Sequence, residues 1–147
     1  MISPILLIAV VAWAAAQVLK LLVSIAIHRK FDINYLITGG GMPSSHSALV
    51  CAAAVSCGIS SGFDSTVFAV SAVLAFIVMY DAAHVRRETG EQSKVLNYIM
   101  HNWVDSRPED FERDLKELIG HTPNQVAVGG ILGAIIGLAG GYIAYGF

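Results

Sequence analysis

The fold is decided by the run PILLIAVVAWAAAQVLKLLVSIAI, Pro4–Ile27, in which Lys20 is the single charged side chain. A helix that crosses about 30 Å of hydrocarbon needs roughly 20 mostly apolar residues, so this run predicts a membrane-spanning helix. The whole chain has the same character, because 55% of its residues are hydrophobic, 14% are charged and the mean hydropathy is +0.64. We therefore predict an integral membrane protein.

Outward from this run, three more apolar stretches lie at about residues 46–62, 66–83 and 124–147. The stretch 46–62 is only marginally long enough to cross a bilayer. A charged insert, residues 84–123, separates the last two stretches. The expected fold is one all-α domain over residues 1–147, an integral membrane helical bundle with four transmembrane helices whose first span covers residues 4–27.

The insert itself carries two sets of apolar residues at helical spacing, which predict two amphipathic helices. The first set is Val95, Leu96, Ile99, Met100, Trp103 and Val104, and the second is Phe111, Leu115, Leu118 and Ile119. Ser106 and Glu109 resemble a capping box at the start of the second helix, and Gly120 fits its end. We expect both helices to lie against the membrane surface or on the end of the bundle.

Charge predicts the sidedness of the loops and the kind of partner. Positive residues occur in the first loop (Arg29, Lys30) and in the insert, whereas the turn 61–65 has none. By the positive-inside rule, the polar loops and any site that they form face the cytoplasm. The formal net charge is −2, which gives no indication of nucleic-acid binding. The expected partners are membrane lipids and a phosphate-bearing substrate or ligand.

Glycine recurs at every fourth position of the last span, which lets another backbone approach closely. The residues are Gly129, Gly133, Gly137 and Gly141. This face is expected to pack either inside the chain's own bundle or against a second copy in a homo-oligomer.

The polar stretch GGGMPSSHSALV, residues 39–50, has the composition of a phosphate site. Glycines permit close backbone approach, and Ser44 or Ser45 can cap a helix whose free N–H groups favour an anion. The alternative is a plain capped membrane helix with an interfacial His46.

A second histidine stands at a predicted helix start. In the run His121-Thr122-Pro123-Asn124-Gln125, Thr122 fits the N-cap, Pro123 the first helical position and Gln125 the third position after the cap. Both helix N-termini are predicted to face the same side, so His46 and His121 could meet at one anion.

Cations for such a site are present. Arg86 and Arg87 follow the third span, and Lys20 lies near the end of the first span. A guanidinium binds phosphate with two parallel hydrogen bonds. The alternatives are contact with anionic lipid for one arginine and snorkelling to the headgroups for Lys20.

At these residues the chain resembles the divergent branch of the type 2 phosphatidic acid phosphatase family, an acid phosphatase family related to vanadium-dependent haloperoxidases. Pro43-Ser44-Ser45-His46 resembles the family's Pro-Ser-Gly-His, and Gly120–Gly129 resembles its His-containing run. The divergent branch's own motifs are matched by Gly40–Ser47 and by Val85–Asn97, which ends in Leu-Asn.

The resemblance implies that His121 is the nucleophile and His46 the general acid. It further implies phosphate contacts from Ser44, Ser45 and Arg86 or Arg87, to which Lys20 could add a positive charge. Gln125 stands where the family has an Asp that orients the nucleophile, and Asp81 is the second orienting candidate.

Three functions compete. The first is a metal-independent, cofactor-free phosphatase that hydrolyses a lipid phosphate, a small phosphomonoester or a pyrophosphate through a phosphohistidine. The second is an inactive relative that binds an anion or a lipid headgroup, or acts in assembly. The third is a metal site made from His46, His84, His121 and Asp81, whose sequence spacing fits no compact ligand motif.

Overall fold

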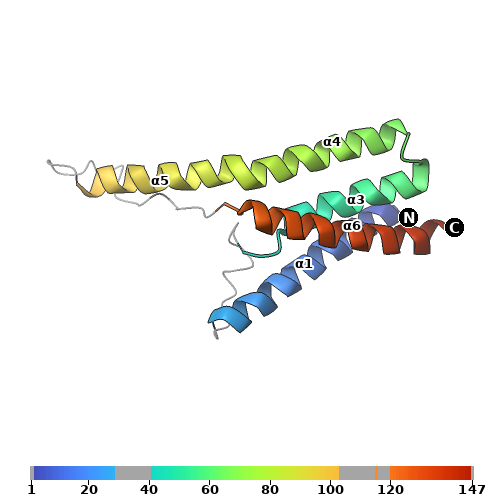
Figure 1. Ribbon diagram of the computed structural model, residues 1–147, viewed down its shortest axis with the longest axis horizontal. Coiled ribbons are helices and arrows are strands. Elements are labelled where there is room, and N and C mark those ends of the chain that lie inside the picture. Colours follow the sequence, from blue (N-terminus) through green and yellow to red (C-terminus); the bar gives the residue numbers. More distant parts are fainter. Residues whose placement is uncertain (1, 29–40, 103–114, 116–119, 147) are drawn as a thin grey trace.

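The computed structural model describes residues 2–28, 41–102, 115 and 120–146, and every regular element within them is a helix. The elements are α1 (Pro4–His28), α3 (Ser45–Ser61), α4 (Thr66–Tyr80), the π-helix η1 (Asp81–Val85), α5 (Arg86–His101) and α6 (Pro123–Tyr145). Figure 1 shows them as a splayed bundle. The predicted all-α membrane fold is therefore confirmed. The predicted second amphipathic helix lies outside the described residues, apart from Leu115 and Gly120.

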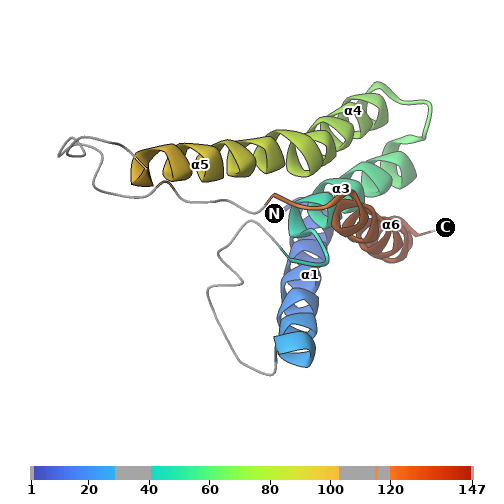
Figure 2. The same ribbon diagram turned by 60° about the vertical axis from the view of Figure 1, so that its left-hand side comes forward.

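The short helix α3 is the centre of the bundle. It has 17 residues, and most of its side chains are buried because α1, α4 and α6 all pack on it. In Figure 2, α1 and the run formed by α4 and α5 leave α3 in different directions. Three other helical runs, Pro4–Ala26, Thr66–His101 and Pro123–Tyr145, are long and apolar enough to cross a membrane. The marginal length predicted for the second stretch is thus confirmed, and its neighbours cover it.

The glycine face of α6 packs against α3 of the same chain. A Cβ atom at Gly129 or Gly133 would overlap backbone atoms of Ser44 or Ala48, and one at Gly137 would lie 2.8 Å from the carbonyl oxygen of Ala52. Gly141 likewise contacts the side chain of Ile59. The close approach that the spacing predicts is made within the chain's own bundle.

The third span does not end where the charged insert begins. Helix α4 continues through η1 into α5, so Thr66–His101 is one helical run of 36 residues, seen in line in Figure 1. Residues 81–89 contain neither glycine nor proline, so nothing in the backbone stops the helix there. The first amphipathic helix of the insert is therefore an extension of the third span, and not a separate helix at the membrane surface.

Candidate functional site

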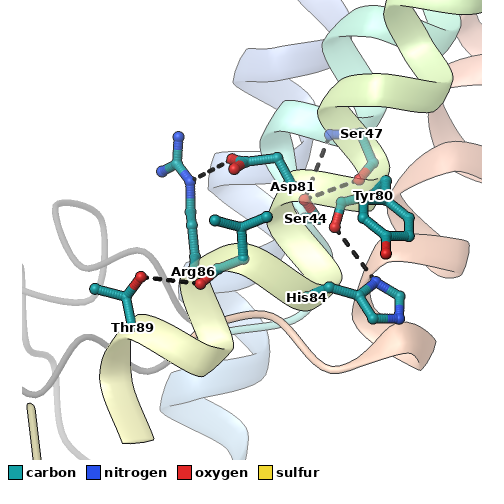
Figure 3. A network of polar contacts seen from close by, with 8 residues as sticks. Ser44, Ser47, Tyr80, Asp81, His84, Arg86 and Thr89 are labelled. Atoms are coloured by element: carbon teal, nitrogen blue, oxygen red, sulfur yellow. Dashed lines mark hydrogen bonds and ion pairs between the residues drawn. The ribbon is translucent and has the colours of Figure 1, made fainter. Parts of the chain in front are cut away.

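The N-terminus of α3 is capped by Ser44. Its Oγ atom accepts hydrogen bonds from the Ser47 N–H at 3.3 Å and from the Ser47 hydroxyl at 3.0 Å (Figure 3). Ser44 and Ser45 are both buried. The sequence left the cap open between these two serines, and the structure assigns it to Ser44. The Ser44 hydroxyl is thus already occupied in holding the first turn that presents His46.

The N-terminus of α6 has the predicted capping box. The Gln125 N–H donates to Thr122 Oγ1 at 3.4 Å, and the Thr122 N–H donates to Gln125 Oε1 at 3.1 Å. The same Oε1 atom lies 3.2 Å from Nδ1 of His121. Capping and orientation, which the sequence offered as separate explanations for Gln125, are therefore performed by one oxygen atom.

This arrangement fixes the tautomer of neutral His121. A backbone N–H can only donate, so the amide atom that faces Thr122 N–H must be the oxygen. An oxygen can only accept from Nδ1, so Nδ1 carries the hydrogen and Nε2 keeps the lone pair. A histidine held in this form presents Nε2 as its nucleophilic nitrogen.

His121 is almost completely enclosed, with 1% of its surface exposed. Its backbone N–H donates to the carbonyl oxygen of Ala82 at 3.2 Å, and its Nε2 atom is buried without a hydrogen-bond partner among the described residues. Burial lowers the pKa of the imidazole, and the nearby charges of Lys20 and His46 act in the same direction, whereas the Gln125 hydrogen bond and the nearby backbone of Gly41 oppose them. Burial thus favours the neutral ring, which is the nucleophilic form.

The rings of His46 and His121, the two histidines at predicted helix starts, lie next to each other. Their ring centroids are 6.4 Å apart and the ring planes are inclined by 64°. The Ser44 N–H donates to the carbonyl oxygen of Gln125 at 3.0 Å, which ties the first turns of α3 and α6 together. His46 is exposed and His121 is buried. The pair therefore has one solvent-facing ring and one enclosed ring.

Lys20 belongs to this site. The residue is 3% exposed, and a Cβ atom at Gly41 would lie 3.1 Å from the Lys20 Cγ and Cδ atoms. Its charge acts on both His46 and His121. Within the part of the chain that the structure describes, no carboxylate forms an ion pair with it. A buried, unpaired ammonium group beside two imidazoles favours an anion.

The two arginines differ in their placement. Arg86 Nε donates to Asp81 Oδ2 at 2.9 Å, both side chains are about half exposed, and both charges act on His46 (Figure 3). Arg87 is exposed, and its backbone lies against Gly120. Asp81 therefore orients Arg86, and Arg86 is the arginine whose charge acts on His46.

The metal hypothesis gains no geometric support. His84 is exposed, and its ring stacks on Tyr80 with centroids 4.5 Å apart (Figure 3). Among the described residues, no group of three His, Cys, Asp or Glu side chains is arranged to hold a metal ion. Cys51 and Cys57 are free thiols.

Sequence reasoning missed the π-helix η1. A π turn shifts the hydrogen-bond register of a helix by one residue, and such turns occur often at functional sites. Here Ala82, within the turn, accepts the His121 N–H, and the turn brings Asp81 and Arg86 into contact across five positions. No residue type in Asp81–Val85 signals this geometry.

Comparisons with known proteins identify the family of this chain. The model of the divergent PAP2 family matches residues 1–136. The chain is 40% identical over 137 residues to a Bacillus subtilis (strain 168) protein named "Uncharacterized membrane protein YuiD", a match that covers 86% of this chain and 87% of that protein. No solved structure matches the chain. This chain is therefore a membrane protein that belongs to the divergent PAP2 family.

Proposed function

We propose that the protein transfers a phosphoryl group from a phosphate ester or anhydride to His121 and then to water. The observation that carries this proposal is the buried Nε2 atom of His121, which has no partner among the described residues and whose ring neighbours that of His46. A lone pair held in this way is suited to nucleophilic attack, and the family membership makes phosphate the expected target.

The first step forms a bond between His121 Nε2 and phosphorus while the bond from phosphorus to the leaving oxygen breaks. His46, in its protonated form, gives its proton to that oxygen. In the second step a water molecule attacks the phosphohistidine, His46 takes a proton from the water, and the nitrogen–phosphorus bond breaks. Inorganic phosphate leaves, and both histidines return to their starting states.

Stabilisation of the transferring group comes from positive charge around its oxygens. Lys20 supplies a buried ammonium group, Arg86 supplies the guanidinium nitrogens that do not bond to Asp81, and the N-terminus of α3 supplies free N–H groups. Gln125 accepts from Nδ1 but carries no charge, so it stabilises the cationic ring of the intermediate less than a carboxylate does. We therefore expect slow turnover relative to anion binding.

The substrate class that fits is a lipid phosphate, a small phosphomonoester or a pyrophosphate, reached from the cytoplasmic face. The second candidate function is binding alone, of an anion or a lipid headgroup, and the neutral Gln125 is the observation that favours it.

Phosphate release from a panel of lipid and soluble phosphates by purified protein in detergent tests the first function, with vanadate binding measured beside it. His121→Asn should abolish phosphoenzyme and release, while His46→Asn should slow release most for substrates with basic leaving oxygens. The matched control is His84→Asn, which removes an exposed imidazole outside the pair. If the protein binds vanadate but releases phosphate from none of the substrates, the result supports the binding function. Equal vanadate affinity in all three variants contradicts both.

A further inference from the structure

The buried face of α5 carries small and polar residues, namely Gly90, Ser93 and Asn97. Both polar atoms of the Asn97 side-chain amide bond to one distant residue. Its Nδ2 atom donates to the carbonyl oxygen of Leu115 at 2.9 Å, and its Oδ1 atom accepts the Leu115 N–H at 2.9 Å. The side chain thereby pairs with a backbone position in the way that a neighbouring β-strand would. Asn97 is also the last residue of the Val85–Asn97 run, of which the proposed phosphoryl transfer uses Arg86 and leaves Asn97 without a role.

Leu115 precedes His121 by six residues. Two further contacts hold the chain against α5 and η1, one at Gly120 and one at His121 itself. Gly120 lies so close to the backbone of Arg87 that a Cβ atom there would overlap the Arg87 nitrogen and Cα. The His121 N–H then bonds to the carbonyl oxygen of Ala82. Leu115, Gly120 and His121 are therefore each held against α5 or η1.

We propose that Asn97 is a positioning residue for His121, acting through Leu115. The inference rests on the proposed function in one respect, which is that His121 is the nucleophile. Asn97 is 6% exposed and Leu115 is 43% exposed, so removing the amide leaves the Leu115 N–H and C=O without their partner in a partly buried place. Among the described residues, the Gly120 contact and the Ala82 hydrogen bond then remain to hold the chain at His121.

Asn97→Ala tests the proposal in purified full-length protein. Expected results are faster hydrogen exchange of the Leu115 amide, altered imidazole nitrogen signals of His121 in NMR spectra, and about tenfold weaker vanadate binding. Asn97→Asp keeps the acceptor for the Leu115 N–H but loses the donor, so it should give intermediate values. The matched control is Asn102→Ala, which removes an amide that bonds within the same helix, to the Tyr98 carbonyl oxygen. It should leave the His121 signals unchanged.

Gly120→Ala should also displace the chain before His121, because its new Cβ would overlap backbone atoms of Arg87. Gly130→Ala is its control, since a Cβ there meets no backbone but the flexible end of Met79 at 3.2 Å and the Cys51 sulfur at 3.4 Å. Faster Leu115 exchange with unchanged His121 signals in Asn97→Ala would overturn the positioning role. If wild-type protein binds no vanadate, the phosphate site fails, while the His121 signals still decide the role of Asn97.

Discussion

The double use of Gln125 Oε1 can be separated by substitution. Gln125→Leu removes the acceptor for both Thr122 N–H and His121 Nδ1, whereas Thr122→Ala removes only the acceptor for the Gln125 N–H. Loss of a helix cap costs about 1 kcal/mol, and each hydrogen bond contributes about 1 kcal/mol. Gln125→Leu should therefore lower the free energy of unfolding by about 2 kcal/mol and Thr122→Ala by about 1 kcal/mol.

The tautomer of His121 should respond only to Gln125→Leu. A lost hydrogen bond of about 1 kcal/mol shifts the ratio of the two neutral tautomers roughly fivefold toward the form with hydrogen on Nε2. That form has no lone pair at the attacking nitrogen. Phosphoenzyme formation should fall by up to this factor, while Thr122→Ala keeps the wild-type rate.

Gln125→Glu is the complementary change. A carboxylate keeps the capping box and adds a negative charge beside the ring. Opposite charges 4 Å apart attract by about 1 kcal/mol in water and about 4 kcal/mol at an effective dielectric constant of 20. The pKa of His121 should rise by about one to three units, and the phosphorylated ring should be stabilised. Nitrogen NMR signals of labelled histidine report both quantities. An unchanged tautomer in Gln125→Leu, or an unchanged pKa in Gln125→Glu, would refute the orienting role.

Three further outcomes are expected. Burial lowers the pKa of His121 in the folded protein, so the unfolded chain binds a proton at this ring more readily. Thermal stability should therefore decline as pH falls below about 6.5, and His121→Gln should reduce that decline. Unfolding midpoints measured against pH test this. Gly133→Leu should separate α3 from α6 and lower stability by several kcal/mol, whereas the exposed Ile131→Leu should not, as unfolding in detergent would report. Cysteines placed at Ser61 and Glu91, in a background without the native thiols, should be labelled from opposite sides of the membrane, and labelling from one side would contradict the topology.

The parts of the site that could be predicted are those that depend on residues close together in the sequence. The apolar runs give the helices, and the side chains of Thr122 and Gln125 signal a helix start at fixed spacing, because capping depends on residues three positions apart. Proximity of the two histidines followed from their places at same-side helix starts.

The remaining parts depend on contacts between distant residues. The Asn97–Leu115 pairing spans 18 positions, and the burial of Lys20 depends on where Gly41 lies. The π turn at η1 is set by packing on the rest of the bundle, since its residues suit an ordinary α-helix equally well. Local pattern carries no information about any of these.

The continuous helix Thr66–His101 links the site to the thickness of the bilayer. A helix of 36 residues is about 54 Å long, well beyond the hydrocarbon layer. Its apolar part, residues 66–85, is about 30 Å long and matches that layer, so a thinner or thicker bilayer creates a mismatch that a change of tilt can relieve. The same helix holds the His121 N–H through Ala82 and carries Arg86 on its next turn. We therefore expect acyl-chain length to act on the geometry of the histidine pair, so that vanadate affinity differs between short-chain and long-chain vesicles.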